Sequence, residues 1–598
     1  MMRKLVLGFL LLTGAQAADS QTFNPLLATM LEDTLDTYVA QIPNIKGMSA
    51  AVWVPGQGIW KDTAGLSFNG QPVTPDMEFG IASNTKLFVA VVMLKLAENN
   101  IFSLDDSLHE WLPALQNVDS NITIRQLLNH TSGISDPIFL SPWMDTIMAN
   151  PTKTFTPNDV LSWLGAPLFL KGTSWGYSNV NYILAGMIAE NATGFHISQL
   201  IRDSILIPLN LDSTFYDVEE PITTTIAHRW FNNVDFHDTS RVGLNSAGGC
   251  AGALFSTASE MVQWYDALMR GQVLNSASMS QLTTFVPTAS VTLDYGLGIG
   301  RETVQGLTFW GHGGSTWGYK SKMIYDSCMN VVVAGLANSF PAGMDGVTFL
   351  LFRVLVNHLP TCAGMISGTD TVCQGQDSVT YTVPAIAKAT SYSWTLPAGI
   401  TGSSATNSIE VNFGLAAVSG SIEVRGTNNY GDGAASSFFV LVNPKPPVPV
   451  VTQNGNIIQS DAIAGNQWYD PTGAIPGANN QAFPPPTNGK YSVIVTLSGC
   501  SSDTSNVIDF VMIGTEDGLA NTRVRVYPVP FGDELVVETR FEELDFEISN
   551  STGQIVFRGS AAGKFRIETG KFSPGVYVIR FSDGRSKVLN KLSDWHLH

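Results

Sequence analysis

The sequence of 598 residues predicts an α+β domain followed by all-β sandwich modules. Up to about residue 360, long segments with helical periodicity alternate with short strand-forming runs, as in a mixed domain with a large core. Beyond about residue 363, helical periodicity disappears, and short alternating runs are separated by residues typical of turns. The chain is longer than one domain usually is, so several domains are expected.

Residues 1–17 have the three parts of a secretory signal peptide. Two basic residues come first, residues 5–12 are apolar, and Ala-Gln-Ala at 15–17 provides a small-residue cleavage site. The longest later apolar run, residues 87–96, contains a lysine and is short for a bilayer, so we expect a buried helix there. The mature chain is therefore predicted to be exported and to contain no transmembrane segment.

The composition limits the possible partners. A net charge of −18 and a pI near 4.8 argue against nucleic-acid binding, because phosphate contacts need a basic surface. No group of histidines and cysteines has the spacing of a zinc site, so no metal is implied. Five cysteines are too few for a disulfide scaffold. Cys362 and Cys373 can form a local bridge, which leaves Cys250, Cys328 and Cys500 unassigned.

The first large domain is predicted over residues 22–360. Helical patterns occupy residues 83–99, 182–191 and 257–269, whereas residues 323–337 are rich in strand formers. Together these elements indicate one enzyme-sized α+β domain.

Two small β-modules are predicted next, over residues 363–443 and 444–515. The first resembles PKD-like modules and the second immunoglobulin-like modules of exported proteins. The second opens with a proline-rich linker at 444–449, which is expected to be stiff. The predicted strands include residues 379–383, 421–424, 438–442, 468–469 and 491–495.

The last domain, residues 520–598, carries three motifs in order. They are Tyr-Pro-Val-Pro at 527–530, Ser-Thr-Gly-Gln-Ile-Val at 551–556 and Ser-Pro-Gly-Val-Tyr-Val-Ile-Arg-Phe at 573–581. This set resembles a type IX secretion sorting domain. The resemblance implies that the type IX machinery is a partner and that the protein passes through the periplasm and across the outer membrane, to the cell surface or the medium.

The strongest chemical signal is the pair Ser83 and Lys86, at the start of a predicted helix. Residues three apart on a helix share one face, so a neutral amine at Lys86 can reach the hydroxyl that it must activate. An apolar wall that includes Leu87 and Val91 disfavours the ammonium form of the lysine. The helix N-terminus favours a developing alkoxide. The pair predicts an acyl-serine enzyme without a Ser-His-Asp triad.

Tyr177-Ser178-Asn179 is a second candidate part of the site. A tyrosine that faces ammonium groups can have its pKa lowered, so that it relays a proton. The amide of Asn179 offers a donor and an acceptor, which can hold both Lys86 and a substrate amide.

The third candidate part is His312-Gly313-Gly314-Ser315. Two glycines would let a substrate lie against an edge strand. The backbone N–H groups of Ser315 and Ser83 are the predicted donors to an oxyanion.

In this order, the Ser-x-x-Lys, Tyr-x-Asn and His-Gly-Gly motifs resemble the serine β-lactamase and D-Ala-D-Ala peptidase superfamily, specifically its class C-like branch. The resemblance covers about residues 25–358. It implies a β-lactamase/transpeptidase-like fold, with an antiparallel sheet flanked by helices plus a helical subdomain. It also implies that Ser83 is the nucleophile, that Lys86 and Tyr177 transfer its proton, and that no cofactor is needed.

By the same resemblance, Asn179 and His312 contact the substrate and the catalytic network, and His130 fixes a loop. Class C β-lactamases typically carry lysine where this chain has His312, which is only partly charged at neutral pH. Anchoring of a substrate carboxylate should then be weaker, which favours a peptidase or esterase over an efficient β-lactamase. Supporting stretches are residues 126–133, 246–249 and 256–260.

The predicted function is a secreted serine hydrolase acting on a D-Ala-D-Ala-type peptide, a β-lactam or an ester. A carboxylesterase of the same fold is one alternative, and an inactive surface adhesin is another, because a soluble substrate gives no obvious reason for the β-modules. A third alternative is a nucleophile elbow at 172–176, with Ser174, Asp294 and His312 as a triad. It lacks the repeated strand–helix units of a parallel sheet around it.

Overall fold

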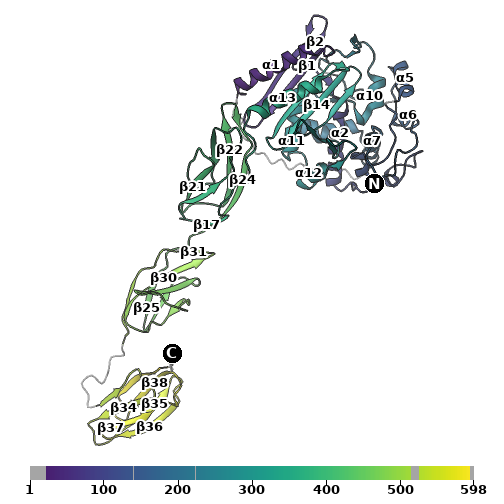
Figure 1. Cartoon of the computed structure of the whole chain (residues 1–598). Coiled ribbons are helices and arrows are strands. Elements are labelled where there is room, and N and C mark those ends of the chain that lie inside the picture. The colour runs from purple at the N-terminus through teal and green to yellow at the C-terminus, as the bar shows by residue number, and fades with distance from the viewer. Residues whose placement is uncertain (1–21, 139, 223, 514–523, 593–598) are drawn as a thin grey trace. The chain divides into compact units, whose positions relative to one another are not determined.

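The computed structural model describes residues 22–138, 140–222, 224–513 and 524–592 (Figure 1). The predicted signal peptide lies outside these ranges. The chain forms two compact units: one comprises the residues up to Val372 together with Gln376–Val442, and the other comprises Cys373–Gly375 and the residues from Asn443 onward. Within the described ranges, no helix has both the length and the apolar composition needed to cross a bilayer.

The first unit is built on a ten-stranded sheet in which the pairings with a known register are antiparallel (Figure 1). The strand β13 (Gly313–Thr316) pairs with β14 beside the main strand path. The path runs β3 (Gln71–Pro72), β2 (Gly58–Phe68), β1 (Gly47–Val54), β15 (Val331–Ala337), β14 (Tyr319–Asp326), β12 (Leu307–Gly311), β11 (Gly300–Val304), β10 (Leu293–Tyr295) and β9 (Val286–Pro287).

Both faces of this sheet are covered by helices. Side chains of β15 alternate between two cores, as the period of two in a strand requires: Val333 packs toward α1 (Pro25–Gln41) and α13 (Met344–His358), whereas Val332 packs into the larger core on the other face. That larger core includes α2 (Thr85–Glu98) and α11 (Ala258–Met269), where Phe88 stacks on Trp264 with ring centroids 4.6 Å apart.

A helical subdomain adjoins the larger core. The predicted fold class, an antiparallel sheet flanked by helices plus a helical subdomain, is confirmed, as are the predicted helices around α2, α7 and α11. The subdomain contains α3 (Leu108–Trp111), α4 (Ile124–Leu128), α5 (Ser141–Ala149), α6 (Pro157–Leu161), α7 (Val180–Thr193), α8 (Ile197–Ile201), a π-helical turn (Arg202–Leu206), α9 (Ile207–Leu209), α10 (Val242–Gly248) and α12 (Ser276–Leu282).

Two small sheets complete this region. They are the strands β4 (Phe79–Gly80), β8 (Leu254–Ser256) and β5 (Phe215–Tyr216), and the strands β16 (Ser339–Phe340), β6 (Trp230–Phe231) and β7 (Val234–Asp235).

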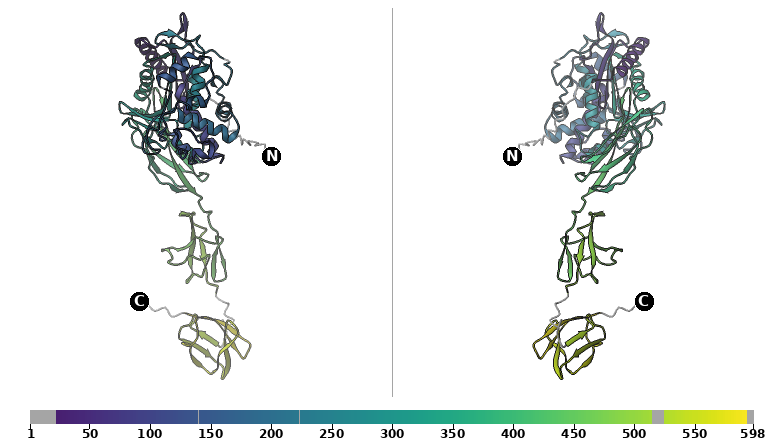
Figure 2. Two further views of the ribbon diagram at one scale, coloured as in Figure 1. Left: turned by 90° about the vertical axis from the view of Figure 1, so that its right-hand side faces the viewer. Right: turned by 90° about the vertical axis from the view of Figure 1, so that its left-hand side faces the viewer.

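The described residues from 371 onward form strands and loops only, as Figure 2 also shows. They make three sandwiches, each from two small sheets around its own apolar core, and this confirms the predicted all-β modules. Tyr381, Trp468 and Ile548 are central in the three successive cores.

The strands of the first sandwich are β17 (Thr371–Cys373), β18 (Val379–Thr382), β19 (Ser391–Thr395), β20 (Ile400–Thr401), β21 (Ser408–Phe413), β22 (Gly420–Asn428), β23 (Gly431–Asp432) and β24 (Ser436–Asn443). Those of the second are β25 (Val451–Asn454), β26 (Ile457–Ser460), β27 (Asn466–Asp470), β28 (Gly473–Ala474), β29 (Ala482–Phe483), β30 (Gly489–Leu497), β31 (Cys500–Ser501) and β32 (Ile508–Phe510). Those of the third are β33 (Val524–Tyr527), β34 (Glu534–Thr539), β35 (Leu544–Asn550), β36 (Ile555–Ala561), β37 (Lys564–Glu568), β38 (Gly575–Phe581) and β39 (Ser586–Lys591).

The disulfide pairing differs from the local bridge that the sequence suggested. Cys328 is bonded to Cys362 and Cys373 to Cys500, with Cα–Cα distances of 5.1 and 5.6 Å. Cys250 is free and buried. The reason is tertiary: α13 packs along β14, which brings the turn after β14 to the residues that follow the helix. A disulfide needs Cα atoms within about 7 Å, and sequence proximity does not measure that distance.

This pairing is directly testable by cysteine alkylation. In unfolded but unreduced protein, iodoacetamide should modify one cysteine, Cys250, because the other four are bonded. After reduction, all five cysteines should be modified. Peptide mapping by mass spectrometry should recover the pairs 328–362 and 373–500, and a peptide linking Cys362 to Cys373 would contradict the structure.

Candidate active site

Ser83 lies at the junction between a short strand and a fully buried helix. The chain leaves β4, passes through the single turn Ala82–Asn84, and enters α2 at Thr85. Ala82 has a left-handed φ of 48°, which is uncommon for a residue with a side chain and marks a strained backbone next to Ser83. The surrounding packing holds this turn in place.

Two hydrogen bonds tie the turn to the central sheet. The hydroxyl of Ser321, on β14, donates to the carbonyl of Ile81 at 2.6 Å, and the side-chain amide of Asn84 donates to the Ser321 hydroxyl at 2.8 Å. Gly314 on β13 lies against the same turn, and a Cβ there would come within 2.2 Å of the Ile81 carbonyl oxygen. Gly314 is therefore required by the packing of the protein itself.

The amine of Lys86 is completely buried and surrounded by oxygen atoms. Lys86 Nζ lies 3.0 Å from Ser83 Oγ, 2.8 Å from Asn179 Oδ1 and 2.7 Å from the carbonyl oxygen of Ala251. The described α2 residues from Thr85 to Leu94 are all buried, as expected for a helix that is apolar around its whole circumference.

This arrangement orients the lone pair of a neutral amine. The oxygens of Asn179 and Ala251 can only accept, so the two N–H bonds of an uncharged Lys86 point at them. The remaining lone pair then faces Ser83 Oγ, which can donate to it. Burial lowers the pKa of Lys86 to about 7, because desolvation disfavours the ammonium form, and the negative charge of Asp136 partly opposes this shift.

Asp136 fixes the orientation of Asn179. One carboxylate oxygen of Asp136 accepts from the backbone N–H of Asn179 at 3.0 Å and from its side-chain amide at 2.8 Å. Because a carboxylate only accepts, the amide nitrogen must face Asp136, and the amide oxygen is left for Lys86. Sequence analysis missed Asp136, since no spacing rule links a loop carboxylate to the Tyr-x-Asn motif.

Tyr177 is the second hydrogen-bond partner of Ser83 Oγ and lies beside Lys86. Its hydroxyl donates to Ser83 Oγ at 2.9 Å, and Lys86 Nζ lies 5.0 Å from the centre of its ring. Burial raises the pKa of the Tyr177 phenol well above its ordinary value, and the hydrogen bond to Ser83 opposes this only in part. The predicted lowering of this pKa was wrong, because desolvation outweighs the hydrogen bond with Ser83 and the negative charge of Asp136 raises the pKa further.

His130 lies beside Tyr177 in the neutral form. Its Nδ1 accepts from the backbone N–H of Ser178 at 3.2 Å and from the side-chain amide of Asn181 at 3.0 Å. Its ring is 4.4 Å from that of Tyr177, centre to centre, and burial lowers the pKa of His130 well below its usual value. These contacts hold the His130 ring against the ring of Tyr177.

His312 is neutral, and both of its ring nitrogens already have partners. Its Nδ1 donates to the carbonyl of Gly313 at 2.6 Å, so its Nε2 accepts from the Tyr295 hydroxyl at 2.8 Å. Burial lowers the pKa of His312 to about 3, and the positive charge of Lys86 acts in the same direction. The expectation that His312 is partly charged at neutral pH is therefore wrong. Sequence analysis missed Tyr295, its partner.

The remaining predicted residues divide between the site and other places. Ser315 and Asn179 line a pocket together with Ser83. The place of a Cβ at Gly313 is open space, whereas at Gly314 it is filled by the turn before α2. That the two glycines let a substrate lie against this strand stays a prediction. Ser315 is exposed on β13, and within the described residues this strand pairs with β14 alone.

The nucleophile-elbow alternative lacks its triad. Ser174 is exposed in the segment before α7, and Asp294 forms an ion pair with Arg301 at 2.6 Å. His312 contacts Tyr295 and Gly313. Within the described residues, no hydrogen bond joins Ser174, Asp294 and His312.

The described residues also contain no group of three or more histidine, cysteine, aspartate or glutamate side chains that could hold a metal ion.

Comparison with known proteins decides the family. The model of the family described as beta-lactamase matches residues 35–353, which is more than half of the chain. The chain belongs to the beta-lactamase family. Two further models match, one for a PKD-like domain at 359–440 and one for a secretion system C-terminal sorting domain at 525–593. Those two resemblances are confirmed, whereas the immunoglobulin-like assignment of residues 444–515 stays a prediction.

The similar proteins in this family are distant. A penicillin-binding protein of Bacillus subtilis (strain 168) is 27% identical over 277 residues, which cover 42% of this chain and 59% of that protein. A D-aminopeptidase of Cereibacter sphaeroides is 25% identical over 346 residues, covering 56% of this chain and 65% of that protein. The chain thus spans less than two thirds of the length of these relatives.

A solved structure shows the same fold. The D-amino acid amidase from Ochrobactrum anthropi SV3, complexed with L-phenylalanine, superposes with a TM-score of 0.50 at 26% sequence identity. The match covers 55% of this chain and 97% of the amidase. Members of this family named as D-aminopeptidase and D-amino acid amidase therefore share the domain that carries Ser83.

The acidity of Lys86 provides a test of this site. We expect the Lys86 amine to titrate near pH 7, and Asp136→Asn to move its midpoint to lower pH, because the carboxylate charge raises the pKa of the lysine. Asparagine keeps an oxygen that can accept from Asn179. The midpoint can be followed by NMR of protein labelled with carbon-13 at the lysine ε-carbon. An unchanged midpoint in Asp136→Asn, or one near 10 in the wild type, would contradict the electrostatics described above.

Proposed function

We propose that this protein is an exported serine hydrolase that forms an acyl intermediate on Ser83. The observation that carries the proposal is the fully buried Lys86 amine, 3.0 Å from the hydroxyl of Ser83, with the Tyr177 hydroxyl 2.9 Å from the same oxygen. Relatives in the family named as peptidase and amidase support this reading.

In the proposed mechanism, neutral Lys86 accepts the proton of Ser83 as its oxygen attacks a carbonyl carbon. The backbone N–H groups of Ser83 and Ser315 stabilise the negative oxygen that develops. Tyr177, which stays protonated because its pKa is raised, donates its proton to the leaving group and regains one from the Lys86 ammonium. Water then attacks the acyl-enzyme while Lys86 accepts its proton, the bond between the carbonyl carbon and Ser83 Oγ breaks, and Lys86 returns the proton to Ser83 Oγ. Gly314 packs against the turn that holds Ser83, and Asn179 holds the Lys86 amine, so both residues position the reacting groups.

Uncharged surroundings favour an amide or ester substrate without a carboxylate on its leaving group. His312 is neutral and bonded to Tyr295, so it offers no cation to such a carboxylate. Lys322 lies opposite Gly313 across the β13–β14 ladder, but it is paired with Glu302 at 2.5 Å. We therefore favour an amidase, aminopeptidase or esterase over a D-Ala-D-Ala carboxypeptidase. The complete hydrogen-bond network around Ser83 argues against an inactive adhesin.

Export is supported by the sorting domain at 525–593. We infer that the type IX machinery carries the chain across the outer membrane, and that the enzyme acts at the cell surface or in the medium. The PKD-like module then separates the hydrolase domain from that sorting domain along the chain.

Nucleophile identity can be tested with a fluorescent penicillin and a chromogenic ester. Ser83→Ala should abolish covalent labelling and lower ester hydrolysis by about 1,000-fold or more, because the attacking oxygen is lost. Ser174→Ala, a matched change at an exposed serine, should retain both activities. Intact-mass spectrometry identifies the acyl-enzyme, and labelling that survives in Ser83→Ala would overturn the proposal.

Leaving-group preference can be tested with a matched pair of peptides. Acetyl-D-Ala-D-Ala and its C-terminal amide differ only in one negative charge. Since His312 is neutral and Lys322 is paired with Glu302, we expect kcat/KM for the amide to equal or exceed that for the acid. A preference of about 10-fold or more for the acid would indicate a carboxylate anchor and contradict the assignment.

A further inference from the structure

An apolar pocket opens directly beside the Ser83 hydroxyl. It has a volume of about 200 Å³, and Ser83, Asn179 and Ser315 lie in its wall. The rest of the wall is mainly apolar and comes from two sides. Its large apolar side chains are Ile138, Met144 and Ile147 around α5, Leu244 on α10, and Trp317 and Phe340 on the opposite side.

None of the described residues that line this pocket carries a charge. Its volume is smaller than the roughly 300 Å³ at which sites for drug-sized ligands begin, so it suits a single side chain. An apolar cavity of about 150 Å³ in another protein accommodates benzene. A pocket of this size and lining therefore matches an aromatic ring or a branched aliphatic group.

The position of Tyr177 indicates which part of a substrate enters the pocket. In the proposed mechanism, the leaving group must approach the Tyr177 hydroxyl to receive its proton. Tyr177 does not line the pocket, whereas Ser315 and Asn179 do. Once the carbonyl carbon is bonded to Ser83, the leaving group lies toward Tyr177, and the acyl group extends to the other side.

We propose that this pocket is the acyl-side subsite and that it selects a substrate with a large apolar side chain next to the scissile carbonyl. This inference rests on the proposed function of Ser83 and adds the class of side chain that the enzyme prefers. The side chains of Met144, Leu244 and Trp317 line this subsite.

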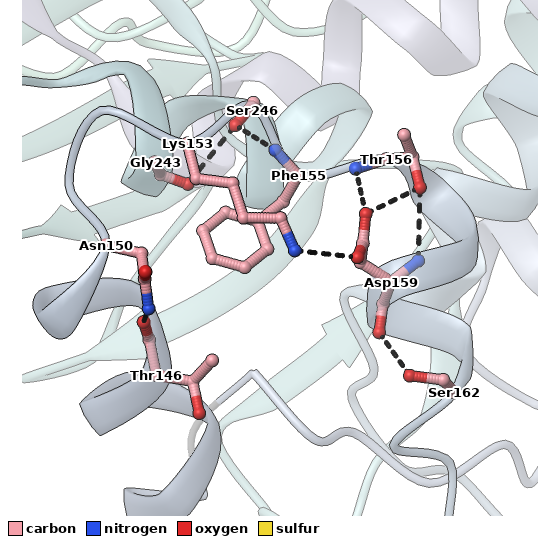
Figure 3. Close-up of polar contacts among 9 residues, drawn as sticks. All are labelled: Thr146, Asn150, Lys153, Phe155, Thr156, Asp159, Ser162, Gly243 and Ser246. Atoms are coloured by element: carbon pink, nitrogen blue, oxygen red, sulfur yellow. Dashed lines mark hydrogen bonds and ion pairs between the residues drawn. The ribbon is translucent and has the colours of Figure 1, made fainter.

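Both walls are held in place without a ligand. Figure 3 shows the segment between α5 and α6 tied to α10, where the backbone N–H of Phe155 donates to Ser246 Oγ at 2.9 Å. Lys153, in the same segment, forms an ion pair with Asp159 on α6 at 3.0 Å. On the opposite wall, Trp317 stacks on Phe231 with ring centroids 4.5 Å apart.

Close backbone packing adds to the rigidity of the helical wall. The backbone N–H of Gly243 donates to the carbonyl of Pro151 at 2.7 Å. A Cβ at Gly243 would come within 2.8 Å of the Asn150 carbonyl oxygen, so only glycine allows α10 to approach this segment. A preformed pocket needs little reorganisation when a side chain enters, which favours selective binding.

The first test varies the acyl group and keeps the leaving group constant. We expect kcat/KM for the p-nitrophenyl ester of 3-phenylpropionate to exceed that for the acetate ester by about 10-fold or more, after correction for spontaneous hydrolysis. The 3-(4-carboxyphenyl)propionate ester has a similar size and one added charge. It should lose most of this advantage, because the described lining contains no cation to pair with it.

The second test compares two methionines on the same helix. Met144 lines the pocket, whereas Met148, one turn further along α5, does not. Met144→Phe should fill part of the pocket and lower the ratio of kcat/KM for the phenylpropionate ester to kcat/KM for the acetate ester by about 10-fold. The matched variant Met148→Phe should keep the wild-type preference.

The outcomes separate this inference from the proposed function. If the wild type hydrolyses both esters through Ser83 with kcat/KM values within about two-fold, or if Met144→Phe keeps the preference, the subsite assignment is wrong and the proposed function stands. If no ester is hydrolysed and no acyl-Ser83 forms, both are overturned. Equal losses of both esters in Met144→Phe would also count against the subsite, because blocking of an acyl pocket must discriminate between them.

Discussion

The site depends on one buried amine. Lys86 has no exposed surface, and its Nζ is held among three oxygen atoms. Desolvation brings its pKa close to neutrality, so that the amine can be uncharged and basic at the same time. The two acceptors that cannot donate, Asn179 Oδ1 and the Ala251 carbonyl, leave its lone pair facing Ser83. In the proposed mechanism, a change that hydrated this amine would remove the base and leave the nucleophile Ser83 unchanged.

Separate parts of the fold supply the surroundings of that amine. The buried helix α2 provides the apolar wall, and the turn before it presents Ser83 with a strained residue, Ala82, next to it. The N-terminus of α7 brings Asn179, whose amide is oriented by Asp136 from a neighbouring loop. The residues before β8 contribute the carbonyl oxygen of Ala251. Because these segments are far apart in sequence, the site exists only when the core of this domain is complete.

The neutrality of Tyr177 and His312 is the second property that shapes the chemistry. Tyr177 is held as a neutral phenol and His312 as a neutral imidazole, both because burial penalises their charged forms. The adjoining pocket is lined by apolar and uncharged polar side chains in the part of the chain that is described. In the proposed mechanism, backbone N–H groups stabilise the charge that develops on the reacting oxygen. Under the proposed subsite, the substrate is recognised by shape and apolar contact.

Local sequence determined the fold class, the buried helix after Ser83 and the ordered motifs at Ser83, Tyr177 and His312, because periodicity and short spacings encode local geometry directly. Tertiary structure alone decided which cysteines pair, since the distance between their Cα atoms depends on the packing of α13 against β14. It likewise decided that His312 and Tyr177 are neutral and that Asp136 belongs to the site. Burial and the partners of a polar atom are properties of the packed three-dimensional arrangement, and no spacing along the chain specifies them.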